Sequence, residues 1–404
     1  MSGRWFRFKG AVLLRTILLC LLLAPLLSGC RSVPAPVTRL PPLPTTPPPV
    51  AAAPEPTTPE PAAPQTAAPQ PAAPIAVEPV PAPTVPTVPT PPPVSQPEPP
   101  KEAWQPLARW AGEHGFSRPT RAPASAPGAY ALKNGDATLS LTLGSCRVVW
   151  DGLELWLGYP PHMINGELCL HSVDAEKNLA PLVRKREPEG LTNRVIVLDP
   201  GHGGDNLGAR SMLDGRYEKE YTLDWALRLK PLLQAQGWQV FLTRTNDVEM
   251  SLSNRIAFAE THSAALFVSL HFNALGVPGG RAGLETYCLT PPGLPSTLVR
   301  DYPDDLAQAF PNNAFDTENW WWAVRLHRAL VRHLSQPDRG VRHARFMGVL
   351  RGQNRPAVLL EGGYLSNPRD ARLIGSRAYR QRLAEAVAGG LNPEPKASAT
   401  FARD

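Results

Sequence analysis

The prolines of this 404-residue chain limit its fold more than any other feature of the sequence. More than half of the 49 prolines lie between Pro34 and Pro100, mixed mainly with Ala, Thr, Val and Gln. Because proline fixes φ and cannot donate a backbone hydrogen bond, such a segment cannot build a packed core. We expect residues 30–103 to be a disordered linker with extended polyproline II character. Roughly 300 residues then remain, enough for one small and one medium domain.

An export signal is predicted before this linker, in residues 1–29. Basic residues precede and enter the apolar run LLCLLLAPLL, which is too short to span a bilayer comfortably. The run ends in LLSGC, which resembles the lipobox of bacterial lipoproteins. That resemblance implies cleavage before Cys30 and a lipid anchor on Cys30. A plain signal peptide with a chance cysteine is the alternative.

The lipid anchor sets the expected location of the protein. Arg31 and Ser32 follow Cys30, and neither is the aspartate that retains lipoproteins in the inner membrane. The resemblance therefore implies a cell-envelope protein anchored to the outer membrane at its periplasmic face. In that oxidising compartment, a bridge between Cys146 and Cys169 and buried free thiols both remain open. We expect no nucleic-acid partner.

Residues 104–190 are predicted to form a small β-rich domain. The alternating stretch ATLSLTL and the apolar pairs RVVW with LELWL and HMI with ELCLH predict short strands. Asp151-Gly152 and Asn165-Gly166 lie within those pairs and predict two-residue hairpins. The arrangement resembles the small non-catalytic domain named after the N-terminus of copper amine oxidases, a name that does not imply copper here. Wall contact and a spacer role both remain open.

Residues 191–393 predict an α/β domain, followed by a disordered tail at 394–404. The short apolar runs VIVLD, ALFVSLH and AVLLE are typical of strands covered on both faces, with helical stretches between them. An apolar stripe from Tyr221 to Gln236 predicts one of these helices, with Gly237 as its stop. We therefore expect a mainly parallel sheet with helices on both faces, of the phosphorylase/hydrolase-like kind.

Polar residues follow or close these apolar runs. His202 lies in the glycine-rich loop after the first run, His271 closes the second, and Glu361 closes the third. Because ligands of open α/β sheets bind outside the carboxyl ends of the strands, we expect these side chains to converge at one edge. Two histidines and a carboxylate are the ligand set of a catalytic zinc site. Glu218 is the best placed further carboxylate near His202, and Glu220 is the alternative.

Several motifs of this region resemble those of zinc-dependent N-acetylmuramoyl-L-alanine amidases, cell-wall amidase family 3. In order they are DPGHGG, EKEYTLDWALRLK, LTR, SLHFNA, GLET and VLLEGGYLSNP, between residues 194 and 391. Residue by residue, the resemblance implies His202, Glu218 and His271 as ligands of one Zn²⁺. It implies Glu361 as the catalytic glutamate.

The resemblance also implies a reaction, hydrolysis of the amide between the lactyl group of N-acetylmuramic acid and L-alanine in peptidoglycan. Zinc lowers the pKa of water to about 7 and polarises the scissile carbonyl. Glu361 is expected to accept the water's proton and to pass it to the leaving amine. The expected biological role is wall remodelling, septum splitting or turnover, with an activator protein as a candidate partner.

Further residues near the motifs are candidates for supporting roles. Asp199 is predicted to orient His202. A second group is predicted to hold substrate or loops, and it comprises Arg244, Arg255, Asn273 and Glu285. Salt bridges and helix caps are the alternative for all of them. Two features depart from the common amidase pattern, Pro231 within its helix and the proline-rich residues 288–318.

Two other functions stay open from the sequence alone. A zinc peptidase would cut within the stem peptide, although the H-E-x-x-H motif of many such enzymes does not occur in the sequence. A non-catalytic peptidoglycan-binding envelope lipoprotein would not need Glu361 beside the metal ligands. Release of free stem peptide would separate the amidase from both.

Overall fold

The computed structural model describes residues 103–123, 127–135, 137–183, 191, 193–276, 279–298 and 302–392. The predicted signal peptide, the lipidation site Cys30, most of the predicted linker and the predicted tail lie outside the described residues. Within the described part of the chain, no helix is both long and apolar enough to cross a bilayer. All described residues belong to one compact unit.

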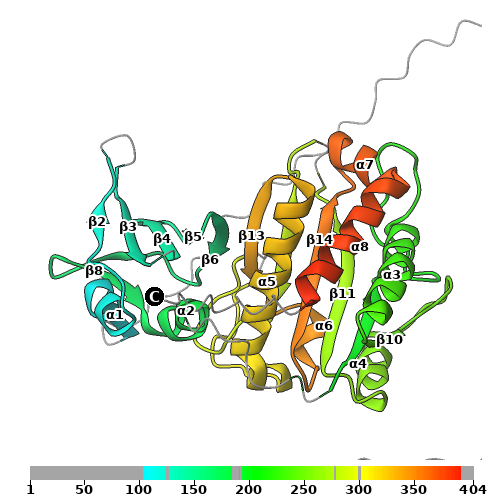
Figure 1. The fold of residues 1–404 in the computed structure, drawn as a ribbon, viewed down its shortest axis with the longest axis horizontal. Helices are drawn as coiled ribbons and strands as arrows, with labels where there is room; N and C mark the ends of the chain where they lie inside the picture. Colours follow the sequence, from blue (N-terminus) through cyan, green and yellow to red (C-terminus); the bar gives the residue numbers. More distant parts are fainter. Residues whose placement is uncertain are drawn as a thin grey trace, which may run out of the picture. The chain divides into compact units, whose positions relative to one another are not determined.

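Residues 104–183 form the N-terminal module, which is β-rich as predicted (Figure 1). Its strands are β1 (Trp104–Pro106), β2 (Thr120–Arg121), β3 (Ala129–Asn134), β4 (Ala137–Thr142), β5 (Arg147–Trp150), β6 (Leu153–Trp156), β7 (His162–Ile164) and β8 (Glu167–His171). Its helices are α1 (Leu107–Glu113), the π-helix η2 (Asp174–Leu179) and α2 (Ala180–Val183). Strands β1, β8 and β7 form a separate three-stranded sheet.

Both predicted hairpins of the module are present. β5 pairs with β6 around Asp151-Gly152, and β7 pairs with β8 around Asn165-Gly166, both antiparallel. All four turn residues have positive φ, 50° and 78° in the first turn and 50° and 81° in the second. Positive φ at both central positions is the backbone that matches the strand twist, which is why Asp-Gly and Asn-Gly predict such turns. The described cysteines Cys146, Cys169 and Cys288 are free thiols.

Residues 193–392 form an α/β region, in agreement with the predicted fold class. Its strands are β9 (Val195–Pro200), β10 (Gln239–Leu242), β11 (Leu266–Asn273), β12 (Leu284–Cys288), β13 (Asp338–His343) and β14 (Ala357–Tyr364). Its helices are α3 (Glu218–Ala235), α4 (Leu252–Thr261), the 3₁₀-helix η3 (Pro311–Phe315), α5 (Asp316–Leu334), α6 (Gly348–Arg351), α7 (Pro368–Gly375) and α8 (Arg377–Leu391).

The strands of this region are mainly parallel. In the order β10-β9-β11-β14-β12-β13, every neighbouring pair is parallel except β14 with β12. A parallel return usually needs a long crossover, commonly a helix. β12 follows β11 without a helix between them, and it runs antiparallel to β14. The carboxyl ends of β9, β11 and β14 consequently share one edge of the sheet.

Two apolar layers pack on the two faces of this sheet. One contains Val268 and Leu270 of β11 with side chains of α3, α5 and α8. The other contains Phe267 of β11 and Leu359 of β14 with side chains of α4 and α6. Because side chains alternate along a strand, His271 and Glu361 lie on the face that carries α4 and α6.

The N-terminal module continues this sheet through one strand pair. Leu155 of β6 lies opposite Val341 of β13 in parallel register, so that the module's strands complete an eleven-stranded sheet. The Trp156 indole donates to the Arg339 carbonyl at 3.1 Å. A Cβ at Gly340 would lie 2.7 Å from the Trp156 ring, so a side chain there would force the indole away. The predicted boundary near residue 190 falls in 184–190, outside the described residues.

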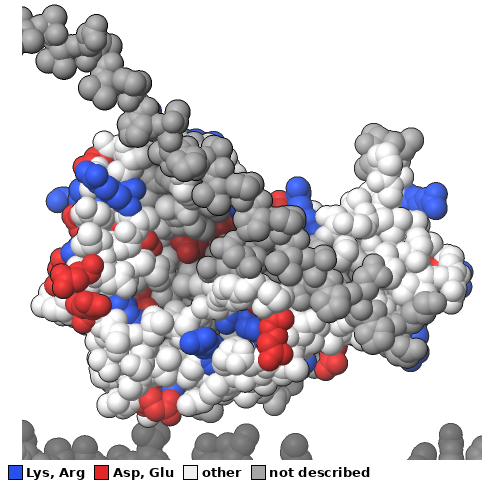
Figure 2. All heavy atoms as spheres, turned by 180° about the vertical axis from the view of Figure 1, so that it is seen from behind, with Lys and Arg blue, Asp and Glu red and all other residues white. Residues whose placement is uncertain are grey.

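The arginines in β13 and just after it do not form one basic surface. Arg342 and Arg345 are each only 4% exposed, and Arg339 pairs with Glu285 at 3.1 Å. On the face drawn in Figure 2, the basic and acidic side chains of the described residues lie in small mixed groups. Arg342 and Arg345 thus pack inside the fold, and Arg339 is neutralised by a buried carboxylate.

A buried histidine next to the module predicts a pH-dependent stability. His343 on β13 is 1% exposed, and its Nε2 lies 2.9 Å from Oδ1 of Asn178 in η2. Burial lowers the pKa of His343 to about 4. In the unfolded chain a histidine titrates near pH 6.5, so between these values only the unfolded state binds the proton. The contribution of neutral, buried His343 to the free energy of unfolding is therefore fully present above pH 6.5. It is lost as the pH drops towards 4, by about 3 kcal/mol at the limit.

Urea unfolding at pH 7 and pH 5 measures this effect. His343→Gln should lower stability at pH 7 but flatten its decrease towards pH 5, because the variant has no imidazole to protonate. His333→Gln is the matched control, since the His333 side chain is 43% exposed. An unchanged pH slope in His343→Gln would show that another group carries the acid sensitivity.

Candidate metal centre

The loop after β9 places His202 in an unusual backbone conformation. His202 has φ of 61°, in the left-handed region that few residues other than glycine adopt. Arg244 donates to the carbonyls of Pro200 at 3.0 Å and Gly201 at 2.8 Å, and Arg255 donates to the His202 carbonyl at 2.8 Å. Two buried guanidinium groups thus hold three successive carbonyls and fix the loop. Strained backbone of this kind is typical of functional sites.

Glu218 reaches the loop from the first turn of α3. The helix begins at Glu218, and the Glu220 carboxylate accepts the Tyr217 N–H and so caps the first turn. Glu220 also pairs with Arg216 at 2.8 Å. The alternative carboxylate Glu220 is therefore a helix cap, and Glu218 is the one that points towards His202.

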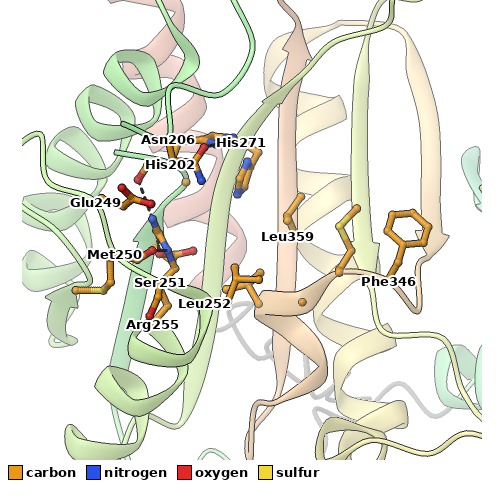
Figure 3. A pocket seen from close by; sticks show the side chains of 15 residues that line it. His202, Asn206, Glu249, Met250, Ser251, Leu252, Arg255, His271, Phe346 and Leu359 are labelled. Atoms are coloured by element: carbon orange, nitrogen blue, oxygen red, sulfur yellow. Dashed lines mark hydrogen bonds and ion pairs between the residues drawn. The ribbon is translucent and has the colours of Figure 1, made fainter. Parts of the chain in front are cut away.

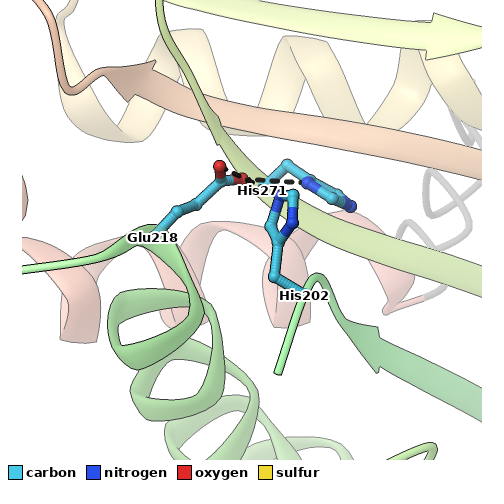
Figure 4. A group of neighbouring side chains, drawn as sticks. All are labelled: His202, Glu218 and His271. Carbon is cyan, nitrogen blue, oxygen red and sulfur yellow. Dashed lines mark hydrogen bonds and ion pairs between the residues drawn. The ribbon is translucent and has the colours of Figure 1, made fainter. Parts of the chain in front are cut away.

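The structure brings His202, Glu218 and His271 together (Figure 4). Glu218 Oε2 lies 3.0 Å from His202 Nε2, and Glu218 Oε1 lies 2.9 Å from His271 Nδ1. Their potential ligand atoms all lie within 4.8 Å of one another. These side chains come from a loop, a helix and a strand that only the folded chain unites.

Backbone donors hold the Glu218 carboxylate in place. Oε2 accepts the Ala209 N–H at 2.9 Å, and Oε1 accepts the Phe272 N–H at 3.0 Å. Burial disfavours the charged form, but the hydrogen bonds with His202 and His271 outweigh it and lower the pKa of Glu218. Glu218 is therefore an anion fixed between two imidazoles, which is the charge arrangement that a cation site needs.

Glu361 lies beside this cluster in the sheet. It is directly opposite His271 in the parallel ladder of β11 and β14, and opposite Glu285 in the ladder of β14 and β12. Its side chain is buried, and Oε2 has no hydrogen-bond partner. Burial, together with the charges of Glu218 and Glu285, raises the pKa of Glu361 well above its usual range. An unpartnered buried carboxyl is costly and is characteristic of a group reserved for chemistry.

Glu285 is fully buried and, unlike Glu361, has many partners. Its Oε2 accepts the hydroxyls of Tyr287 at 2.8 Å and Tyr364 at 2.7 Å, and the Asn273 amide at 3.0 Å. Its Oε1 pairs with Arg339 at 3.1 Å. Asn273 and Glu285 thus belong to a structural network next to Glu361. This network keeps the negative charge of Glu285 in the sheet, directly opposite Glu361.

One predicted contact is wrong, because Asp199 does not orient the His202 ring. Its carboxylate accepts the hydroxyls of Thr243 at 2.6 Å and Ser269 at 2.8 Å, and it pairs with Arg255 at 2.5 Å. Asp199 acts on the loop only through Arg255. Glu218 holds Nε2 of the His202 ring, and Asn206 holds the other ring nitrogen, with its Oδ1 2.7 Å from Nδ1.

A cavity of about 450 Å³ opens onto the two histidines (Figure 3). It lies between the loop after β9, the start of α4 and the segment that leads into α6. Its lining comprises Asp199, Gly201, His202, Asn206, Glu249, Met250, Ser251, Leu252, Arg255, His271, Phe346, Met347, Gly348, Val349 and Leu359. The described residues of 288–318 take no part in this lining.

A glycine beside the cluster predicts a sensitive position. A Cβ on Gly201 would lie 2.2 Å from His271 Cε1 and 2.4 Å from Nε2, so Gly201→Ala must displace the imidazole. We expect the variant to fold but to bind zinc at least about tenfold more weakly, as a displaced ligand would.

Zinc content after dialysis against a competing chelator measures the Gly201→Ala effect. Gly389→Ala is the matched control, because no atom lies within 4 Å of the Cβ it would add. Wild-type zinc retention in Gly201→Ala would show that the close approach of the loop to His271 is not required for metal binding.

Comparison with known proteins agrees with this arrangement of motifs and fold. Residues 196–393 match the N-acetylmuramoyl-L-alanine amidase family. The chain is 34% identical over 198 residues to the N-acetylmuramoyl-L-alanine amidase CwlM of Bacillus licheniformis, covering 48% of this chain and 66% of that protein. It is 33% identical over 238 residues to the N-acetylmuramoyl-L-alanine amidase AmiC of Neisseria meningitidis serogroup B, covering 54% and 56%.

A solved structure similar to this chain is the catalytic domain of CwlV, an N-acetylmuramoyl-L-alanine amidase of Bacillus (Paenibacillus) polymyxa var. colistinus. The sequences are 30% identical, with 49% of this chain and 96% of that domain covered and a TM-score of 0.41.

The fold is a mixed-sheet α/β domain, and its candidate site is a cluster of potential metal ligands. The family match over residues 196–393 and the similar sequences support placing this region in the N-acetylmuramoyl-L-alanine amidase family, cell-wall amidase family 3.

Proposed function

We propose that this protein is a zinc-dependent hydrolase that cleaves the amide between N-acetylmuramic acid and L-alanine in peptidoglycan. The observation that carries the proposal is the meeting of His202, Glu218 and His271 beside a buried, unpartnered Glu361, within a segment of an amidase family. Two imidazoles and one carboxylate are the protein ligands of a catalytic zinc site that keeps a position open.

The geometry of the cluster fits a zinc ion. Tetrahedral zinc with bonds of about 2.0–2.1 Å places its ligand atoms about 3.3 Å apart. The two histidine–carboxylate separations, 3.0 Å to Oε2 and 2.9 Å to Oε1, are close to that value, and all the potential ligand atoms lie within 4.8 Å of one another. A cation held here would also reverse the local charge and favour the ionised form of Glu361. His202, Glu218 and His271 are therefore the proposed ligands.

The proposed reaction assigns separate roles to ligands and base. Bound zinc supplies Lewis acidity, which acidifies water and polarises the scissile carbonyl. Glu361 accepts a proton from the attacking water, and the same carboxyl delivers it to the leaving α-amine of L-alanine. Its burial and lack of a hydrogen-bond partner leave Oε2 free for this transfer. Asn206 and the backbone donors on Glu218 keep the ligand side chains in one orientation.

The proposed substrate also suggests where the protein is located and what the proline-rich linker does. We propose that Cys30 carries a lipid in the outer membrane and that the proline-rich linker lets the enzyme reach the wall. Peptidoglycan is the proposed partner in remodelling, septum splitting or turnover, and an activator protein is a further candidate. The chain spans 66% and 56% of the two curated relatives' own lengths. These assignments are therefore proposed for this chain from its own sequence and are not taken over from the relatives.

Removal and return of the metal tests the proposed function. The zinc-loaded full chain should release dye from labelled peptidoglycan, lose this activity after chelation, and regain it with one equivalent of Zn²⁺. Mg²⁺ at the same concentration is the control, because it prefers oxygen ligands and should not restore activity. Undiminished release after complete metal removal would contradict a zinc enzyme. Zinc binding without any release would instead favour a binding lipoprotein.

A further inference from the structure

The cavity beside the histidines has two chemically different sides (Figure 3). Polar groups of His202, Asn206 and Glu249 lie on one side. Apolar side chains lie on the other, where Figure 3 labels Leu252 of α4, Phe346 from the segment before α6 and Leu359 of β14; Met347 before α6 and Val349 of α6 also line the cavity. The roles proposed above for the ligands and the base do not use this apolar side.

The apolar side is held firmly from behind. Phe346 and Met347 pack on a buried cluster that includes Tyr287, Leu350 and Leu359. The segment before them is anchored by Arg345, which is 4% exposed and donates to the carbonyls of Pro291 at 3.0 Å and Leu294 at 2.9 Å. Its own N–H donates to Ser296 Oγ at 2.8 Å. The proline-rich excursion that departs from the amidase pattern therefore supports this side of the cavity.

Leu252 completes this side from α4. It is 53% exposed, although it lines the cavity, and its Cδ1 would lie 2.6 Å from a Cβ at Gly348. The absence of a side chain at Gly348 thus lets Leu252 lean over the start of α6. A large exposed leucine beside a polar site exposes apolar area that a bound ligand would cover.

We propose that Leu252, Phe346 and Met347 form an apolar subsite that determines specificity for the alanyl methyl group next to the scissile amide. This inference rests on the proposed function, in which that amide carries the alanyl methyl on one side and the lactyl methyl on the other. An apolar wall in contact with one methyl group discriminates by about 10- to 200-fold against its absence. The same wall also keeps water away from the reacting amide.

Two synthetic substrates test the subsite, a muramoyl-L-alanyl peptide and the same peptide with glycine in place of alanine. Zinc-loaded wild-type protein should show a kcat/KM about tenfold or more higher for the alanyl substrate. Leu252→Ala and Met347→Ala should bring this ratio below about threefold by slowing alanyl hydrolysis, while glycyl hydrolysis and zinc content stay near wild type. Leu252 is exposed, so its replacement should not unfold the protein.

Leu227→Ala is the matched control, because Leu227 is 46% exposed on α3 and does not line the cavity. Its alanyl-to-glycyl ratio should equal that of wild type. Hydrolysis of both substrates at equal rates by wild type, or an unchanged ratio in Leu252→Ala and Met347→Ala, would overturn the subsite and leave the amidase proposal intact. Hydrolysis of neither substrate by zinc-loaded wild type would overturn the amidase proposal and the subsite with it.

Discussion

Glu361→Gln should keep its zinc and lose turnover by about 10²- to 10⁴-fold, the usual contribution of a general base. The amide retains the size of the carboxyl and can still hydrogen-bond, but it cannot accept a proton. Because the carboxyl is buried and Oε2 has no partner, the exchange removes a charge without breaking a hydrogen bond at that atom. The fold should therefore tolerate the change, and Tm should stay within a few degrees of wild type or rise.

Steady-state hydrolysis and metal analysis on the same preparation measure the effect of Glu361→Gln. Glu249→Gln is the matched control, since Glu249 also lines the cavity but lies outside the ladder of His271 and Glu361. It should change turnover by less than about threefold. Near wild-type hydrolysis by Glu361→Gln with one zinc per chain would refute the assigned base. Loss of zinc would instead make Glu361 a ligand.

His271→Ala, unlike Glu361→Gln, should lose its zinc, and it should lose activity because the zinc is lost. The change removes one of three proposed protein ligands and leaves Glu218 with His202 as its remaining imidazole partner. Ligand loss typically abolishes or strongly weakens zinc binding, and catalysis that depends on the metal cannot survive it. We expect no detectable turnover at stoichiometric zinc.

Metal content after gel filtration, together with a zinc titration of activity, measures the effect of His271→Ala. His262→Ala is the control, because His262 packs against Phe241 and Phe258 at the end of α4, away from the cavity lining. It should bind one zinc like wild type. A His271→Ala protein that retains stoichiometric zinc and full turnover would remove His271 from the ligand set.

The convergence of the candidate ligands could be predicted from the sequence because a general rule governs it. Parallel strands end at one edge of a sheet, so His202 after β9 and His271 in β11 had to lie near each other. Glu361 follows the same rule at the end of β14. The hairpins were predictable for a similar reason, since Asp-Gly and Asn-Gly favour one turn geometry. Short-range backbone preferences and sheet topology thus account for most of the site.

Contacts between distant side chains could not be predicted in the same way. Asp199 pairs with Arg255 rather than the nearby His202, and Asn206 contacts His202 from within its own loop. Glu285 takes its partners from four strands, its own included. Each of these side-chain contacts depends on which groups the folded chain buries together. No periodic pattern in the sequence predicts that. The close approach of Gly201 to His271 is likewise a contact between distant residues that the sequence does not predict.

The pairing of the N-terminal module with the sheet of the α/β region could not be predicted from the sequence either. β6 and β13 share one register pair, with a hydrogen bond from the Glu154 N–H to Asp338 Oδ2 at 2.8 Å. Edge strands pair with whatever edge the fold presents to them, and hydrophobic alternation does not specify that partner. The expected strands were therefore right, while their continuation of the catalytic sheet was not foreseen.

The chemical identity of the released products tests the central proposal most directly. The zinc-loaded full chain, incubated with purified peptidoglycan, should release stem peptides that begin with a free L-alanine amine. Mass spectrometry should also find glycan strands whose N-acetylmuramic acid carries a free lactyl carboxyl group. Peptides cut within the stem, with L-alanine still joined to the sugar, would contradict the amidase and indicate a zinc peptidase.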